Sequence, residues 1–188
     1  MEAVLASLRA PRFALRDALP TLPPQAGLYA IYGDDVAWAE LRLGPAAADK
    51  PLYVGKAEDS FVSRDLKTHF ADGRTGSSTV RRSLAALLRT KLALSGIPRN
   101  LRRPADFANF GLSQGDDAVL TAWMRERLQI TVWPTDRSRA LVDIETDVLR
   151  RWNPPLNIAK IDHDWRSFVK QERRVMADQA RRWLPATE

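Results

Sequence analysis

The chain has 188 residues, which suffices for one compact domain, and it has no cysteine, which excludes disulfides and thiolate metal sites. No apolar run approaches the roughly 20 residues that a membrane helix needs. Lysine and arginine exceed the acids by 29 to 23, and most of these cations are arginine, which suits a polyanion partner because guanidinium pairs bidentately with phosphate. An organism-wide preference for arginine over lysine would explain the ratio but not the net charge.

The N-terminal residues 2–19 predict a helix that stops at Pro20. Arg9, Arg12 and Arg16 interrupt its apolar residues, so this segment lacks the uninterrupted core of an export signal. Together with the absence of cysteine, this leads us to expect a cytoplasmic protein.

The remaining pattern predicts an α+β domain with a small mixed or antiparallel sheet flanked by helices and an extra C-terminal helix. The expected strands span residues 27–33, 36–43, 52–55 and 129–133. The expected helices span residues 60–71, 78–94, 117–127, 137–152 and 164–184, and the two prolines in 152–157 require an extended segment. We divide the chain into a helical lead-in (1–22), a core domain (23–160) and a C-terminal helix packed back on it (161–188).

Two short tyrosine segments, Gly27-Leu28-Tyr29 and Tyr53-Val54-Gly55, each follow strand-like residues and could lie side by side. Tyrosines in strands usually serve packing alone. Lys56 comes directly after the second segment, and Arg64 falls on the next predicted helix. Cations beside phenols can lower a phenol pKa and hold a phosphate. A solvated helix face is the ordinary alternative for a single arginine.

Glu145 is the most informative residue on physical grounds. It lies four residues after Leu141 and four before Leu149, which places a carboxylate at the apolar stripe of its helix. Such a carboxylate is costly without a cation or metal partner. The sequence leaves open a structural ion pair with an arginine or a hard-metal site for Mg²⁺.

The segments GLYAIY, PLYVGKA and DIETDVLRRWNPPLNI, in this order, resemble the motifs of the GIY-YIG nuclease family between about Gly27 and Ile158. GRTGSSTVRRSL and WMRERLQITVW resemble segments of stand-alone bacterial and restriction-type members. The resemblance implies a GIY-YIG-like core domain and an endonuclease that hydrolyses DNA phosphodiester bonds with a single Mg²⁺ (or Mn²⁺).

The resemblance also implies roles for individual residues. Tyr29 and Tyr53 would line the site, one of them acting as general base or positioning the attacking water. Lys56 would lower the phenol pKa, and Arg64 would stabilise charge on the phosphate. Glu145 would bind the metal. Gly55 and Asn157, which follows the two prolines, would support the site.

The sequence departs from the family pattern at two places. Residues 34–50 make the interval between the tyrosine motifs long, so we expect an insertion that forms an extended hairpin or a substrate-contacting loop. Some relatives have a histidine one helical turn after the arginine. Here His69 follows Arg64 by five residues, so the two would not share a helix face. A core or semi-buried histidine that supports the site is therefore a better interpretation of His69 than an alternative base.

Cations gather without interleaved acids between residues 74 and 103, next to hydroxyl residues that could grip phosphate at a helix start. A solvated helix with scattered charge is the alternative. We predict that these residues form the nucleic-acid-binding surface: Arg74, Ser77, Ser78, Thr79, Arg81, Arg82, Arg99, Arg102 and Arg103. Arg89 and Lys91 belong to the same cluster.

Three hypotheses compete on the sequence alone. The first is a metal-dependent endonuclease on double-stranded or branched DNA, associated with the nucleoid, with RNA as an open alternative and a homodimer as one way to cut both strands. The second is a nucleic-acid-binding module without catalysis. The third is a protein whose basic face docks an acidic partner.

Overall fold

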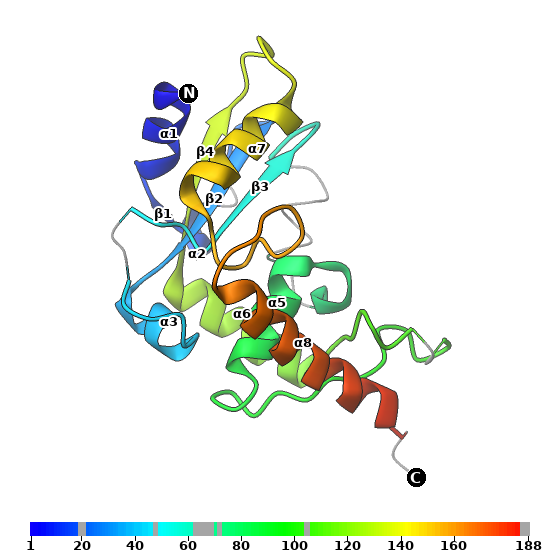
Figure 1. Cartoon of the computed structure of the whole chain (residues 1–188). Coiled ribbons are helices and arrows are strands. Elements are labelled where there is room, and N and C mark those ends of the chain that lie inside the picture. Colours follow the sequence, from blue (N-terminus) through cyan, green and yellow to red (C-terminus); the bar gives the residue numbers. More distant parts are fainter. Residues whose placement is uncertain (19–21, 47–48, 62–69, 71–72, 104–105, 185–188) are drawn as a thin grey trace.

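A four-stranded antiparallel sheet forms the centre of the computed structural model, in the order β1-β4-β2-β3 (Figure 1). The model describes residues 1–18, 22–46, 49–61, 70, 73–103 and 106–184. The strands are β1 (Phe13–Ala14), β2 (Gly27–Gly33), β3 (Tyr53–Ala57) and β4 (Leu128–Pro134). β3 is an edge strand, and its register with β2 places Tyr29 opposite Gly55.

Helices lie on both faces of the sheet, which confirms the predicted α+β class (Figure 1). They are α1 (Glu2–Arg9), α2 (Leu15–Ala18), α3 (Asp35–Glu40), α5 (Thr79–Leu88), α6 (Gln114–Arg127), α7 (Leu141–Trp152), α8 (Trp165–Arg182) and the 3-10 turn η1 (Thr75–Ser77). Among the described helices, none is long and apolar enough to cross a membrane.

The central strand β2 divides the core in two, because successive side chains of a strand point to opposite faces. Tyr29 and Ile31 join the larger core with α5, α6 and α8. Leu28, Ala30 and Tyr32 join the smaller core, which α1 and α7 cover. Six of the seven residues of β2 are buried, so neither face of this strand is exposed to water.

Two element predictions are wrong. The expected helix over 2–19 ends at Arg9, and the chain continues as β1 and α2, since Pro11 cannot continue a helical hydrogen-bond ladder. The expected strand over 36–43 is the helix α3, capped by Asp34, whose side chain accepts a hydrogen bond from the backbone N–H of Ala37. The insertion is therefore not an extended hairpin.

Other elements occur with shifted ends. α5 stops at Leu88 instead of continuing to residue 94, and α7 starts at Leu141 instead of 137. α6 starts at Gln114 because the Ser113 side chain caps it. The expected helix over 60–71 lies mostly outside the described residues.

The C-terminal helix α8 runs along α5, as the apolar spacing of its residues predicted (Figure 1). Glu172 of α8 is buried and forms ion pairs with Arg42 and Arg89. At the other end of the chain, α1 packs on β4 and β1 pairs with β4. The division of the chain at residues 22 and 160 stays a prediction.

Candidate active site

Tyr29 and Tyr53 lie together on one face of the sheet. Tyr29 is on the central strand β2 and buried, and Tyr53 is partly buried on the edge strand β3. Their ring centroids are 6.2 Å apart, and their side chains hydrogen bond to each other. The register explains the contact, because Tyr53 pairs with Ile31, two residues along β2 from Tyr29.

Gly55 gives the phenol of Tyr29 its space. A Cβ atom at position 55 would lie 2.4 Å from the hydroxyl oxygen of Tyr29 and 2.5 Å from its ring carbon Cζ. Any side chain at position 55 would therefore collide with a fully buried ring. Gly55 of the second tyrosine segment thus leaves the space that Tyr29 of the first segment occupies.

Glu145 shares a small pocket with Tyr53. The pocket has a volume of about 140 Å³ and is lined by Tyr53, Thr79, Glu145 and residues 156–160. Glu145 is only 5% exposed and comes from α7, which packs on β3. Its Oε2 atom accepts a hydrogen bond from the Lys160 ammonium. The partner of this buried carboxylate is therefore a lysine and not the arginine that the structural alternative named.

Asn157 fastens the segment after α7 to the edge of the sheet. Its Oδ1 accepts from the backbone N–H of Val54 at 2.9 Å, and its Nδ2 donates to the backbone carbonyl of Val54 at 2.7 Å. The backbone N–H of Leu156 donates to the carbonyl of Leu52 at 3.0 Å. The asparagine amide thus pairs with the exposed edge of β3 as a neighbouring strand would, next to Tyr53.

Burial, together with the nearby charge of Glu145, raises the pKa of Tyr53 to about 12, and the hydrogen bond with Tyr29 opposes this rise. A phenol with this pKa is protonated at neutral pH. The expectation of a phenol with a lowered pKa is not met at Tyr53. The cause is the buried position of the ring beside a carboxylate.

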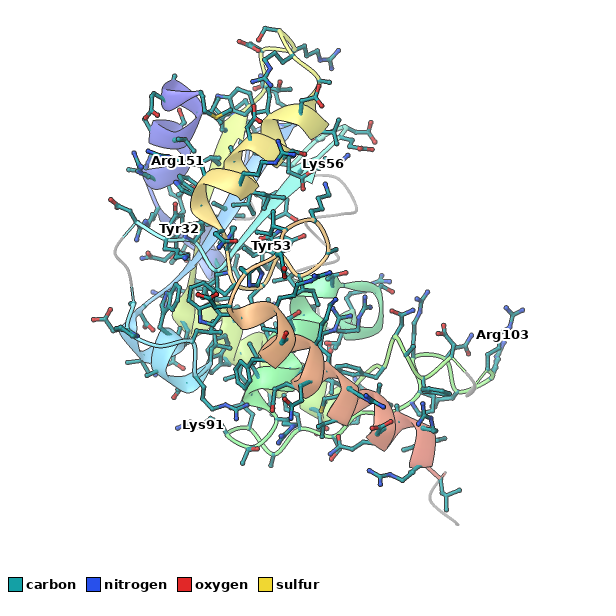
Figure 2. The ribbon with its side chains drawn as sticks, viewed as in Figure 1. Tyr32, Tyr53, Lys56, Lys91, Arg103 and Arg151 are labelled. Carbon is teal, nitrogen blue, oxygen red and sulfur yellow. The ribbon has the colours of Figure 1, made fainter. Side chains whose placement is uncertain are left out.

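Lys56 lies away from the tyrosine pair. Along β3 it shares a sheet face with Val54, opposite to the face of Tyr53 and Gly55. Its ammonium contacts Glu58. Figure 2 shows Tyr53 beside the loop that follows α7, and Lys56 farther along the same strand. The prediction that Lys56 acts directly on the phenols therefore has no support from its position.

Arg64 and His69 lie outside the described residues. Their predicted roles stay predictions. Phe70 and Phe61, on either side of this segment, are both buried in the larger core.

Several residues expected on the nucleic-acid-binding surface are buried instead. Arg81 is fully buried and forms a 3.1 Å ion pair with Asp117 of α6, so it holds α5, η1 and α6 together. Ser78 is buried and caps α5. Arg82 is mostly buried and donates to the carbonyl of Gly76 and the hydroxyl of Thr79. We remove these three residues from the predicted surface.

Three exposed members of that set line a cleft. The cleft has a volume of about 470 Å³ and is lined by Gly73, η1, residues 97–102, residues 111–112 and Asp117. Ser77, Arg99 and Arg102 line it, and the stem of Arg99 packs on Gly76. Arg74 and Arg103 are exposed nearby in sequence, and Figure 2 shows Arg103 far from Tyr53. Thr79, which lines the pocket of Tyr53, is separated from η1 by Ser78 alone.

Burial, together with the positive charges of Arg173 and Arg99, lowers the pKa of Arg82 to about 10. Asp106 is the carboxylate that opposes this effect. The region beside the cleft is therefore electropositive, as an anion-binding surface requires.

Sequence reasoning missed Lys160. Its only signal is a lone cation among Ile158, Ala159 and Ile161, three residues after the asparagine of the proline segment. Sequence reasoning also missed Asp117, which accepts hydrogen bonds from the backbone of Gly73 and the hydroxyl of Thr75 in addition to its ion pair.

Two phenols, a buried carboxylate and an ammonium lie near one another beside the edge strand β3 of this small α+β domain. The family model of the GIY-YIG catalytic domain matches residues 39–175, more than half of the chain, so the chain belongs to the GIY-YIG family. It is accordingly a nuclease. No curated protein and no solved structure matches the chain significantly. The matched range includes Tyr53, Glu145 and Asn157 and begins after Tyr29.

Proposed function

We propose that the protein is an endonuclease that hydrolyses phosphodiester bonds in DNA with one divalent metal ion, Mg²⁺ or Mn²⁺. The observation that carries this proposal is the shared pocket of Tyr53 and Glu145, with the Tyr29 phenol in contact with Tyr53. The family supplies the reaction, and the pocket supplies residues that suit it.

The residues of the pocket fit a hard cation that keeps most of its water. Among the described residues that line this pocket, Glu145 is the one acid. Within the described ranges, there is no group of three histidine, cysteine or acidic side chains that could form a complete metal cage. Mg²⁺ suits such a site, because it commonly binds through one or two carboxylates together with water and substrate phosphates. When bound, it would supply Lewis acidity and neutralise developing negative charge.

The phenol pair would orient the attacking water. Water adds to phosphorus while the bond to the leaving oxygen breaks, and the water must lose a proton in the process. Tyr53 is protonated in the free protein, so it can hold the water by hydrogen bonds at neutral pH. It can accept the proton only if its pKa falls, and neutralising the charge of Glu145 acts in that direction. Either Tyr29 or Tyr53 is the base in this proposal.

Arg64 would stabilise the charge that builds on the phosphate, as the family motif implies. Lys56 would act at longer range from the other side of β3. Asn157 and Gly55 would keep the pocket in shape through Val54 and Tyr29.

The proposed substrate is double-stranded or branched DNA, bound through its backbone by the cleft and its exposed cations: Arg74, Arg99, Arg102 and Arg103. Backbone binding by cations predicts affinity that falls steeply with salt. RNA is the alternative substrate, and a binding module without catalysis is the alternative function. A cytoplasmic, nucleoid-associated location and a homodimer that cuts both strands belong to the same proposal.

The decisive experiment incubates the protein with supercoiled plasmid, single-stranded DNA or RNA, in Mg²⁺ or EDTA. The variants are Glu145→Ala and Arg64→Ala, with Asp143→Ala as a matched control, because Asp143 is an exposed acid on the same helix. We expect metal-dependent nicking that is lost in the first two variants and kept in the control. Full cutting by Glu145→Ala would refute the metal site, and binding without cutting would favour the inactive module.

A further inference from the structure

Lys160 brings an ammonium group into the pocket of Tyr53 and Glu145. We propose that Lys160 is a catalytic cation that contacts the scissile phosphate and is held in place by Glu145. This inference rests on the proposed nuclease function and adds a residue to the same site.

The two partners of the ion pair differ in exposure. The Glu145 side chain is 6% exposed, whereas that of Lys160 is 43% exposed. Lys160 also borders a second cavity, which it shares with Arg150 and Asn153. The carboxylate therefore lies at the bottom of the pocket, and the ammonium lies where a substrate can reach it.

The Lys160 ammonium has more hydrogen-bond donors than its bond to Glu145 uses. A lysine ammonium carries three N–H donors. One of them goes to Oε2 of Glu145, and among the described residues no other acceptor bonds to Lys160. Glu58 attracts it only through space, since the nearby Lys160 charge helps to lower the pKa of the Glu58 carboxyl. The remaining donors can therefore serve a phosphate oxygen.

Backbone contacts fix the position of Lys160. The bonds from Leu156 and Asn157 tie the segment to β3, and Arg166 donates to the carbonyl of Ile158 at 3.1 Å. A fixed cation needs no rearrangement when charge develops on the phosphate, which is the condition for strong electrostatic catalysis.

The pocket has room for several water-sized groups. Its volume of about 140 Å³ is several times the roughly 30 Å³ of one water. Lys160 uses one oxygen of the Glu145 carboxylate, and the other oxygen remains for a hard cation. Lys160 would then place a second positive charge, in addition to that of the metal ion, beside the same phosphate.

The test uses the absence of cysteine from the chain. In Lys160→Cys, the single thiol displaces bromide from 2-bromoethylamine and forms a thioether, which restores an ammonium at nearly the length of lysine. We expect the single-turnover cleavage rate of the unmodified variant to fall about 100-fold. Aminoethylation should return most of the lost rate. Lys170→Cys is the matched control, because Lys170 is an exposed lysine of α8, and neither step should change its rate.

Binding gives a second readout that does not depend on turnover. In EDTA, the slope of log affinity against log salt for a DNA duplex should fall by about 0.9 in Lys160→Cys, as expected for one lost phosphate contact, and aminoethylation should restore it. Thermal unfolding verifies that each variant is folded. A folded Lys160→Cys variant that cuts at the wild-type rate, or that stays slow after complete aminoethylation, overturns the role of Lys160.

The Glu145→Ala variant distinguishes an error in the role of Lys160 from an error in the proposed nuclease function. If the wild-type protein cuts, Glu145→Ala does not, and Lys160→Cys cuts normally, only the inference on Lys160 is wrong. If the wild-type protein cuts no nucleic acid with Mg²⁺ or Mn²⁺, the proposed function itself is wrong.

Discussion

Asn157 replaces a missing neighbour strand for Val54, because one side-chain amide satisfies both the N–H and the carbonyl of that residue at the edge of the sheet. Val54 lies between Tyr53 and Gly55, so this contact fixes the strand that carries the second tyrosine motif. The same segment then leads to Lys160. The Asn157 amide therefore helps to set the relative positions of the pocket residues, together with the backbone bond from Leu156 to Leu52.

Asn157→Ala should lower the free energy of unfolding by about 2–4 kcal/mol, because it leaves a buried N–H and a buried carbonyl of β3 without partners. Cleavage should fall as well, since the positions of Tyr53 and Lys160 depend on this contact. Urea unfolding measures the first effect. Asn100→Ala is the control for stability, because Asn100 is exposed and its side chain accepts a hydrogen bond from the nearby backbone N–H of Arg102. Equal stability of the two variants would contradict the edge-pairing role.

Gly55→Ala should impair the site through Tyr29. The new methyl group would overlap the buried phenol, and overpacking of this kind costs about 1–3 kcal/mol. We expect a displaced ring and slower cleavage, measured by single-turnover kinetics and unfolding. Gly115→Ala is the matched control, because its added Cβ would have only Ser113 Oγ nearby, at 4.0 Å. It should be neutral or slightly stabilising, as alanine favours helix.

The pKa of Tyr53 should respond to the charge of Glu145. The chain has three tyrosines, and Tyr32→Phe removes the other one whose pKa burial raises to about 12. In that background, Glu145→Gln should lower the pKa of Tyr53, measured by the ultraviolet absorbance of phenolate. An unchanged pKa would show that Glu145 does not act on the phenol.

The same shift has a consequence for stability. The raised pKa of Tyr53 means that the folded protein favours the neutral phenol, so this contribution to stability is complete below pH 10 and is lost as pH rises towards about 12. Tyr53→Phe should flatten this loss in urea unfolding measured across the interval. A variant that loses stability as steeply as the parent would contradict the shift.

Substitution of Arg81 should change the stability of the protein, whereas substitution of Arg99 should change its affinity for DNA. Arg81→Ala leaves Asp117 as an unpaired buried charge and should lower the free energy of unfolding by about 3–5 kcal/mol. Arg99→Ala should leave stability unchanged but weaken DNA binding and reduce its salt slope by about 0.9. Urea unfolding and fluorescence anisotropy at several salt concentrations measure the two effects. Similar outcomes for both variants would remove the distinction between core and surface.

Local patterns were sufficient for much of this protein. The strand at 27–33, the caps at Ser78 and the amphipathic helices α7 and α8 follow from hydrophobic spacing and capping, which act over a few residues. The order of the tyrosine motifs, Glu145 and the proline segment indicated the family, and the family model confirms it. The helix α3 was missed because apolar residues in a short segment fit a strand as well as a helix.

Only the tertiary structure decided which side chains meet. The sequence indicates that Arg81 and Arg99 are both cations in a basic stretch, but only packing against α6 makes the first a core residue and leaves the second in a cleft. Likewise, the sequence places Glu145 on an apolar stripe, while the edge pairing of Asn157 selects Lys160 as its partner. These contacts join residues far apart in the chain, and their free energy exists only once the sheet and its helices have assembled.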